Sequence, residues 1–231
     1  MIETQSRLAL PLLEWADIPA GTITLAGIDE AFTITPFKIS RYPITNAQFD
    51  AFIQDGGYKN DLWWQGLAQA GGAPRPSDWK EPDNPKLEVC WYEAVGFCRW
   101  LAHQMGCEVR LPTEWEWQWA AVGDSGWAYP YGPTFDSAQC NSKESSGRTN
   151  LVTEYAHVKT HFDTVDMAGN VWEWCLNEGA IPHNVQIEGT ENRALRGGSW
   201  NDDPKKAQAS FRVHRSTRTR TFNIGFRVIV L

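Results

Sequence analysis

Short strands are predicted where hydrophobic and polar residues alternate. The segment 18–27 (IPAGTITLAG) alternates and contains glycine, and 32–39 (FTITPFKI) continues in the same way. A period of two is typical of a strand with one buried face. The sequence also predicts a short strand at 109–111 and a terminal strand, buried on both faces, at 226–231 (FRVIVL).

Helical spacing is clearest at 89–105 (VCWYEAVGFCRWLAHQM), where apolar residues recur on one face and Gly106 is a predicted C-cap. A second long helix is predicted over 112–121, beginning at a Pro-Thr-Glu sequence. Residues 47–53 also have helical spacing, after a predicted N-cap at 43–46 (PITN).

The remaining long segments are predicted to be loops. Residues 54–88 are rich in Gly, Pro, Asp and Trp, and 122–164 have no clear period. Two main helices and short antiparallel strands predict a loop-rich α+β fold. Because no repeat, low-complexity tract or Ser-rich linker divides the sequence, a single domain over residues 1–231 is expected.

Composition adds a tryptophan-rich core to this description. Thirteen Trp are present, and each brings large apolar area and an N–H that needs a partner, so large rings are expected between the loops. A net charge of -7 disfavours a whole-chain nucleic-acid footprint. No apolar run approaches a membrane span, and no basic and apolar leader is seen, so a soluble cytoplasmic protein is expected unless the sequence is part of a longer one.

The cysteines favour a reducing environment. Their number is odd and no Cys-x-x-Cys pair occurs, so buried free thiols are expected. The five are Cys90, Cys98, Cys107, Cys140 and Cys175.

The C-terminal part of the chain, 193–231, has two regular ends and an irregular middle. It opens with 196–200 (RGGSW) and closes with 224–231 (IGFRVIVL), and the polar and aromatic residues between them have no clear period. Gly197 and Gly198 allow a tight turn and a close backbone approach. A scaffold that fixes both ends of a patternless stretch indicates a displayed binding surface.

Five segments, in order, resemble the formylglycine-generating enzyme (sulfatase-modifying factor) family. They are 42–46 (YPITN), 89–98 (VCWYEAVGFC), 110–117 (RLPTEWEW), 166–174 (DMAGNVWEW), and 196–200 (RGGSW) with 225–227 (GFR). The resemblance spans roughly 15–231, and the order of all five makes it specific. It implies a C-type-lectin-like fold with little regular structure, held together by Trp and by Ca²⁺. Such a fold does not settle the function.

Two enzymatic branches of this family are disfavoured by the residues present. Formylglycine-generating enzymes carry two copper-binding cysteines shortly after the Gly-Gly-Ser-Trp-like segment, and residues 201–231 contain none. Ergothioneine-type sulfoxide synthases hold iron with His-x3-His-x-Glu on a separate helical domain, which is missing here. The nearest match, His157, His161 and Asp163, lies between predicted turns and is interpreted as a surface loop. We therefore predict no enzyme, and no copper or iron.

A third branch comprises the variable proteins of diversity-generating retroelements. Their hypervariable C-terminal segment lies between similar Gly-Gly-Ser-Trp and Ile-Gly-Phe-Arg ends. It arises by mutation of template adenines, typically in AAC codons, which yields Phe, Val, His, Ser, Thr, Arg, Asp or Asn but not Lys or Gln. Residues 211–223 (FRVHRSTRTRTFN) and 201–203 fit this set, whereas Lys205, Lys206 and Gln208 are expected to be fixed.

We therefore predict a non-catalytic variable protein that binds an unidentified protein or other macromolecule through region 196–227. Arg212, Arg218 and Arg220 are predicted to be structural, reaching carbonyls or carboxylates below the surface. The ligand-binding residues are predicted to be Trp200, Asn201, Asp202, Asp203, Phe211, Val213, His214, Ser216, Thr217, Thr219, Thr221, Phe222 and Asn223.

Other interpretations stay open. The Thr and Arg alternation also suits a solvated strand with Phe211 and Phe222 in the core. Nucleic-acid binding by Arg215, Arg218 and Arg220, with Phe222 stacking, is disfavoured by the acidic net charge. An oxidoreductase of the formylglycine-generating or sulfoxide-synthase type is an alternative, as is a sensor module of a larger signalling protein.

The resemblance also implies structural Ca²⁺, which prefers hard oxygen ligands. The ligands of a first site would be the Asp166 side chain, the Gly169 and Val171 carbonyls and the Glu173 carboxylate. Those of a second site would be Asn141, the Ser142 carbonyl, Glu144 and the Ser146 carbonyl. The alternative for Glu173 is a salt bridge to a neighbouring Arg.

Overall fold

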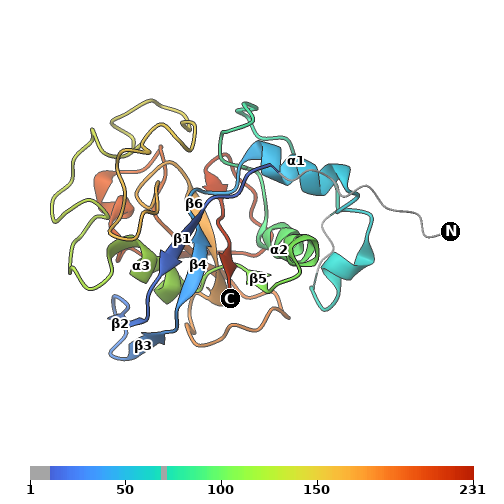
Figure 1. Cartoon of the computed structure of the whole chain (residues 1–231), viewed down its shortest axis with the longest axis horizontal. Coiled ribbons are helices and arrows are strands. Elements are labelled where there is room, and N and C mark those ends of the chain that lie inside the picture. Colours follow the sequence, from blue (N-terminus) through green and yellow to red (C-terminus); the bar gives the residue numbers. More distant parts are fainter. Residues whose placement is uncertain (1–10, 69–71) are drawn as a thin grey trace.

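A computed structural model describes residues 11–68 and 72–231 (Figure 1). Its helices are α1 (Asn46–Gln54), α2 (Trp91–Met105) and α3 (Glu114–Val122), with the 3-10 turns η1 (Asp61–Trp64) and η2 (Pro204–Ala207). Its strands are β1 (Trp15–Ile18), β2 (Gly21–Thr24), β3 (Ala31–Ile34), β4 (Phe37–Ser40), β5 (Val109–Arg110), β6 (Trp172–Glu178), β7 (Arg193–Arg196), β8 (Val213–Arg215), β9 (Ile224–Gly225) and β10 (Ile229–Val230).

The predicted helices are confirmed, and local capping defines their ends. In α1 the Thr45 hydroxyl accepts from the Gln48 amide at 3.3 Å, while the Gln48 side chain accepts from the Thr45 amide at 2.9 Å. Thr113 and Glu116 form the same reciprocal box at the start of α3. Gly106 ends α2 with a φ of 72°, the left-handed conformation that favours glycine.

Strand boundaries differ from the prediction for a physical reason. The segment 32–39 covers parts of two strands, β3 and β4, and the segment 18–27 covers the last residue of β1 and all of β2. The breaks fall at Pro19 and Pro36, which cannot donate to a ladder. The predicted terminal strand 226–231 is shorter in the structure, since only Ile229–Val230 (β10) forms a strand there. Residues 224–229 are buried as predicted, whereas Leu231 is 51% exposed. Strand β6 was not predicted, since all seven of its residues are buried and show no alternation.

The strands form three small sheets. One has the order β1-β4-β10-β5, with antiparallel pairs throughout. The hairpin β2-β3 is separate, and the third sheet has the order β8-β7-β6-β9, in which β6 and β9 run parallel. Three strands of the C-terminal segment join these sheets: β8 lies at one edge of the third sheet, β9 at its other edge, and β10 inside the first.

Tryptophans join helices to loops in the core, as the composition predicts. Trp91 and Trp174 are fully buried, and their indole N–H groups donate to the carbonyls of Cys175 at 2.9 Å and Val89 at 3.0 Å.

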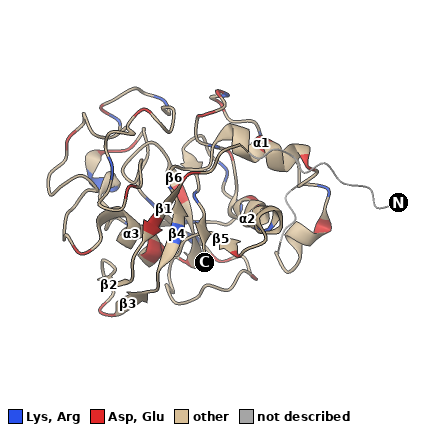
Figure 2. Cartoon of the chain, viewed as in Figure 1, with Lys and Arg blue, Asp and Glu red and all other residues tan. Residues whose placement is uncertain are grey.

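All five cysteines are free, and four of them are buried while Cys107 is half-buried. Acidic and basic positions are interspersed along the chain (Figure 2). In the described ranges, no helix is both long and apolar enough to cross a bilayer.

Candidate functional site: a fastened C-terminal segment

Two bidentate ion pairs fasten the C-terminal segment to the scaffold. Arg212 donates to Glu114 through Nε at 2.8 Å and through Nη2 at 2.6 Å. Arg227 donates to Glu173 through Nε at 2.6 Å and through Nη2 at 2.8 Å. Both carboxylates are fully buried. Parallel charge-assisted bonds of this kind fix orientation as well as position.

A third pair lies between these two in the sequence. Arg220 Nη2 is 3.0 Å from Glu93 Oε1, and Glu93 is buried in the first turn of α2. The same oxygen accepts a hydrogen bond from the Tyr58 hydroxyl at 2.6 Å. Burial and the Glu93 charge together raise the pKa of Tyr58, which keeps the phenol protonated as a donor. The structural roles predicted for Arg212 and Arg220 are confirmed, whereas the side chain of Arg218 is exposed.

The three arginines reach three different elements. Glu114 is the first residue of α3, Glu93 the third of α2 and Glu173 the second of β6. Removing one partner of a buried pair costs about 3–5 kcal/mol, because the other charge remains buried. The C-terminal segment is therefore held in place by these three ion pairs, and the residues between the arginines are not required for its attachment.

The predicted ligand residues differ in exposure. The exposed ones are Asn201, Asp203, His214, Ser216 and Phe222. The half-buried ones are Trp200, Phe211, Val213, Thr219, Thr221 and Asn223. These eleven residues are the part of the predicted set that reaches the surface.

Two predicted ligand residues belong instead to the interior. Asp202 accepts hydrogen bonds from the Trp172 indole at 2.7 Å and from the Ser199 hydroxyl. Thr217 is fully buried, and its carbonyl accepts from the Trp91 amide at 3.1 Å. The prediction that Thr217 faces outward is wrong, because it ties the exposed turn of the segment to the start of α2.

An aromatic cluster, formed by Trp79, Trp200 and Phe222, lies at the surface. The Trp200 ring is 5.3 Å from Trp79 and 5.7 Å from Phe222, which is 39% exposed. Phe211 instead packs 6.3 Å from Trp172, next to the core. The alternative interpretation, which placed both Phe211 and Phe222 in the core, is therefore partly correct for Phe211 and wrong for Phe222. Sequence reasoning missed Trp79, although it placed that residue in a Trp-rich loop.

The first predicted calcium site has one feature that suits a cation. Asp166 is buried, its Oδ2 accepts from Asn170 Nδ2 at 2.9 Å, and its Oδ1 has no hydrogen-bond partner in the described part of the chain. Burial raises the pKa of Asp166 to about 7. The predicted alternative for Glu173 is also present. Its Oε2 accepts from Arg227 Nε and, at 2.6 Å, from the Trp117 indole, while Oε1 accepts from Arg227 Nη2 at 2.8 Å and retains one further acceptor position.

The second predicted calcium site adjoins the first. Asn141 pairs with Gly169 in an isolated bridge, and the Asn141 carbonyl accepts from the Asn170 amide at 2.7 Å. The Asn141 side-chain oxygen already accepts from Ser146 at 3.1 Å. Ser142 is buried, whereas Glu144 is exposed. No cluster of three or more His, Cys, Asp or Glu suited to a metal occurs in the ranges 11–68 and 72–231, so calcium stays a prediction.

The histidine-containing stretch is a loop, as predicted. His157 stacks on Tyr155 with ring centroids 6.2 Å apart, and the His161 ring packs edge-on against Phe162 at 5.5 Å. Asp163 pairs with Lys159 at 3.1 Å. The carboxylate of this near-match therefore already has a partner.

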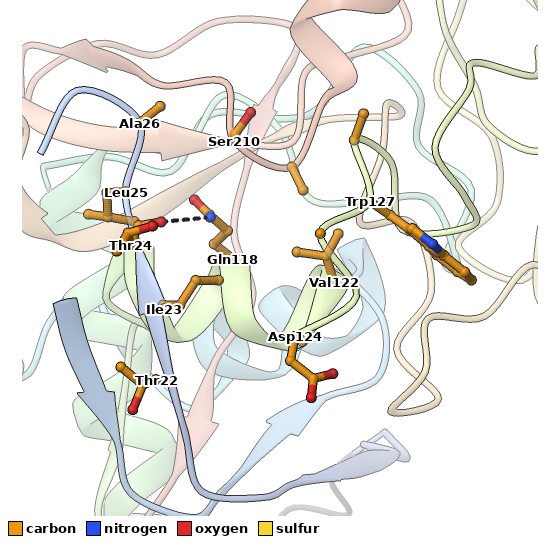
Figure 3. Close-up of a pocket in the computed structure, with 14 residues that line it drawn as sticks. Thr22, Ile23, Thr24, Leu25, Ala26, Gln118, Val122, Asp124, Trp127 and Ser210 are labelled. Carbon is orange, nitrogen blue, oxygen red and sulfur yellow. Dashed lines mark hydrogen bonds between the residues drawn. The ribbon is translucent and has the colours of Figure 1, made fainter. Parts of the chain in front are cut away.

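An open cavity of about 660 Å³ adjoins the fastened segment and was not predicted. Strand β2, the end of α3 and the turn that follows it form the walls, and Ala209 and Ser210 complete them. Figure 3 shows Gln118 crossing this space to donate to the Thr24 carbonyl, at 3.1 Å. Arg212 also donates to the carbonyl of Ala26, at 3.3 Å. Ala26, which lines the cavity, is therefore hydrogen-bonded to the anchoring residue Arg212.

Comparison with known proteins gives the relationships of this chain. The family described as the sulfatase-modifying factor enzyme 1-like domain matches residues 10–230. Hercynine oxygenase of Mycolicibacterium smegmatis is 31% identical over 78% of this chain and 49% of its own length. Formylglycine-generating enzyme of Thermomonospora curvata is 28% identical over 69% of this chain and 70% of its own. The chain spans about half the length of the hercynine oxygenases that it matches.

The solved structure of Treponema denticola variable protein 1 superimposes with a TM-score of 0.72, at 22% identity and 94% coverage of both chains. This likeness confirms the predicted α+β fold, which is C-type-lectin-like and of the formylglycine-generating-enzyme type.

One prediction is contradicted by the relatives. The absence of cysteine from 201–231 led to the expectation that the protein is not an enzyme. Curated relatives named hercynine oxygenase and formylglycine-generating enzyme are enzymes, and they match most of the chain. The lack of cysteine in 201–231 therefore does not show that the protein has no enzymatic activity.

Proposed function

Because the chain belongs to the family of sulfatase-modifying factor enzyme 1-like domains, we propose that region 196–227 is its ligand-binding surface. The ligand is a protein, and the surface is of the kind that diversity-generating retroelements vary. The aromatic cluster and the exposed His214 and Ser216 supply the contacts. Aromatic rings flanked by polar groups are favoured at protein interfaces.

The observation that carries this proposal is that structural residues and exposed residues alternate along the C-terminal segment. Arg212, Arg220 and Arg227 each bind a buried glutamate, while His214 and Phe222 lie exposed between them. Exposed positions far from stabilising features change stability by less than about 0.5 kcal/mol when substituted. The surface can therefore change its chemistry while the anchors preserve its shape.

Calcium is proposed as a brace for this scaffold. The buried Asp166 carboxylate would hold the ion, with the Gly169 and Val171 carbonyls beside it and the remaining acceptor of Glu173. The bound ion would supply positive charge to two buried carboxylates. Among the described residues, Asp166 Oδ1 has no hydrogen-bond partner, and this buried oxygen supports the proposal.

The test of variability is a paired library. In one library Asn201, His214, Ser216 and Phe222 are randomised; in the other, Arg212, Arg220 and Arg227 are. Each is displayed on phage, and the folded fraction is measured by resistance to proteolysis. The surface library should stay mostly folded, and the anchor library should not. Equal losses in both would contradict the proposal.

Ligand binding is tested with the surface library by selection against lysozyme as a defined probe. Selected variants should bind it with a melting temperature close to that of the parent. Failure to obtain any binder from a folded library would oppose the recognition role. In the genome, the proposal expects a reverse-transcriptase gene nearby and a near-copy of the DNA for 196–227 that differs at adenines.

A second candidate is oxidoreductase activity within a longer protein. The matches to hercynine oxygenases, which extend well beyond this chain, favour it. The purified protein is assayed for bound iron and copper and for oxygen consumption with hercynine. Uptake of oxygen that depends on hercynine would support this candidate, and metal-free, inert protein would remove it for this chain alone.

A further inference from the structure

Lys86 is a buried cation that forms no ion pair within the described part of the chain. Its side chain is 4% exposed, and Nζ lies 5.3 Å from the centroid of the Phe49 ring. Nζ donates to the Arg75 carbonyl at 2.6 Å and lies 3.5 Å from the Ser77 hydroxyl. In the ranges 11–68 and 72–231, no carboxylate lies within 4.0 Å of Nζ. Neutral oxygens thus account for at most two of its three hydrogens.

An arrangement of this kind is unusual, because burying an ammonium group is unfavourable unless it is paired. Desolvation lowers the pKa of Lys86, while the charges of Glu93, Asp50 and Glu88 act in the opposite direction. Two other buried cations, Arg196 and Arg227, show the usual solution, since each has a glutamate within 4.0 Å. The buried Arg193 instead donates to the carbonyls of Leu176 and Glu188 and lies over the Trp91 ring. Among the described residues, Lys86 has no such glutamate partner.

Lys86 lines a pocket with a volume of about 320 Å³. One wall belongs to α1, which contributes Asn46, Asp50 and Ile53, and the loop 74–80 forms the other. That loop brings two further cations, Arg75 and Lys80. The groups around the pocket therefore comprise three cations and one carboxylate.

The pocket has a preformed wall. The buried Asn46 side chain donates to the Trp79 carbonyl at 2.9 Å and to the Glu81 carbonyl at 3.0 Å. The Ser77 hydroxyl donates to Asn46 Oδ1 at 2.8 Å. These bonds hold the loop against α1, so the cations need little ordering when a ligand binds.

We propose that this pocket binds a small oxyanion, a carboxylate or a phosphate, with the Lys86 ammonium as its buried partner and Lys80 and Arg75 at its rim. Arg75 is only partly engaged, since its guanidinium is 3.6 Å from Glu88 and 59% exposed. Asp50 opposes the anion by like-charge repulsion and limits its affinity. The site lies outside region 196–227 and is independent of the function proposed for that region.

The test is calorimetric titration of the intact chain at pH 7 and low salt, with inorganic phosphate and with acetate in separate experiments. Saturable binding of one equivalent is expected for at least one of them. Binding of phosphate alone indicates a phosphate site and binding of acetate alone a carboxylate site. If neither binds at millimolar concentration, the proposal is wrong.

Three variants assign the binding to this pocket. Lys86→Met should weaken it by about tenfold or more, because a buried charge-assisted bond is lost. Asp50→Asn should strengthen it about two- to fivefold, since it removes the opposing carboxylate. Lys59→Met, at an exposed lysine outside the pocket lining, should leave it unchanged. Unchanged affinity in Lys86→Met, or weaker binding in Asp50→Asn, would overturn the assignment.

Should Lys86→Met fail to fold, Lys80→Gln provides the same test at an exposed position. It is expected to weaken binding about two- to fivefold while the melting temperature stays constant. The proposal would also be contradicted by two results together. They are unchanged affinity for the anion in folded Lys80→Gln and no increase in affinity in Asp50→Asn.

Discussion

Replacing Arg227 by methionine tests whether the buried anchors maintain the fold. Arg227 is fully buried, and besides its two bonds to Glu173 it donates to the carbonyls of Ser40 at 3.1 Å, Arg41 at 3.3 Å and Val165 at 2.9 Å. Methionine fills much of the same volume with no charge and no donor. The substitution therefore isolates the electrostatic and hydrogen-bonding role.

The expected loss follows from what remains. Glu173 would stay buried with only the Trp117 indole, which donates at 2.6 Å, and three carbonyls would lose a donor. Breaking a buried pair from one side costs about 3–5 kcal/mol. For a chain of this size each kcal/mol corresponds to about 2–4 °C, so the melting temperature should fall by about 6–20 °C.

Urea denaturation followed by tryptophan fluorescence measures the free energy of unfolding. The matched control is Arg218→Met, an exposed arginine of the same segment, which should change stability by less than about 0.5 kcal/mol. The double variant Arg227→Met with Glu173→Gln should recover part of the loss, since no buried charge is left unpaired. A loss below about 1 kcal/mol in Arg227→Met, or an equal loss in the control, would refute the anchoring argument.

Three further outcomes are expected. In a selected variant that retains Phe222, Phe222→Ser should abolish binding with little change in the free energy of unfolding. Phe211→Ser should also destabilise the protein, because that ring packs against Trp172, and reversed effects in urea denaturation would contradict this. Calcium should raise the melting temperature of the parent and not of Asp166→Ala, and an unchanged parent would exclude the brace. Burial raises the pKa of Cys90 to about 11 from an ordinary 9.0; because the folded value is the higher one, its contribution to stability is complete below pH 9 and is lost as the pH rises through 11. Unfolding free energies at pH 8 and pH 11, compared with those of Cys90→Ala, measure that loss, and identical pH profiles would refute it.

Local signals predicted the helices well. Thr45 and Thr113 mark helix starts because a cap acts on residues three positions away, and Gly106 marks an end through its own backbone. Strand β6 was missed because burial on both faces removes the period on which such a prediction depends. Periodicity therefore identifies elements with one solvated face and fails for those in the centre.

The candidate site was predictable in position and only partly in detail. That Arg212 and Arg220 reach inward was predicted, but their partners are 98 and 127 residues away in sequence. Thr217 and Asp202 have the composition of surface residues and are buried through bonds to distant elements. A single sequence carries no signal for those pairings, which arise from the arrangement of α2, α3 and β6.

The place of β10 governs the order in which the chain can assemble. This strand lies between β4 and β5, with Ile229 opposite both Ile39 and Arg110, so the two strands that it joins do not pair with each other. Synthesis delivers β10 after everything that it connects. Closure of that sheet therefore waits until the C-terminal segment has left the ribosome, and until then β4 and β5 present unpaired edges. Such a chain is expected to fold slowly, and to depend on protection from aggregation until β10 is in place.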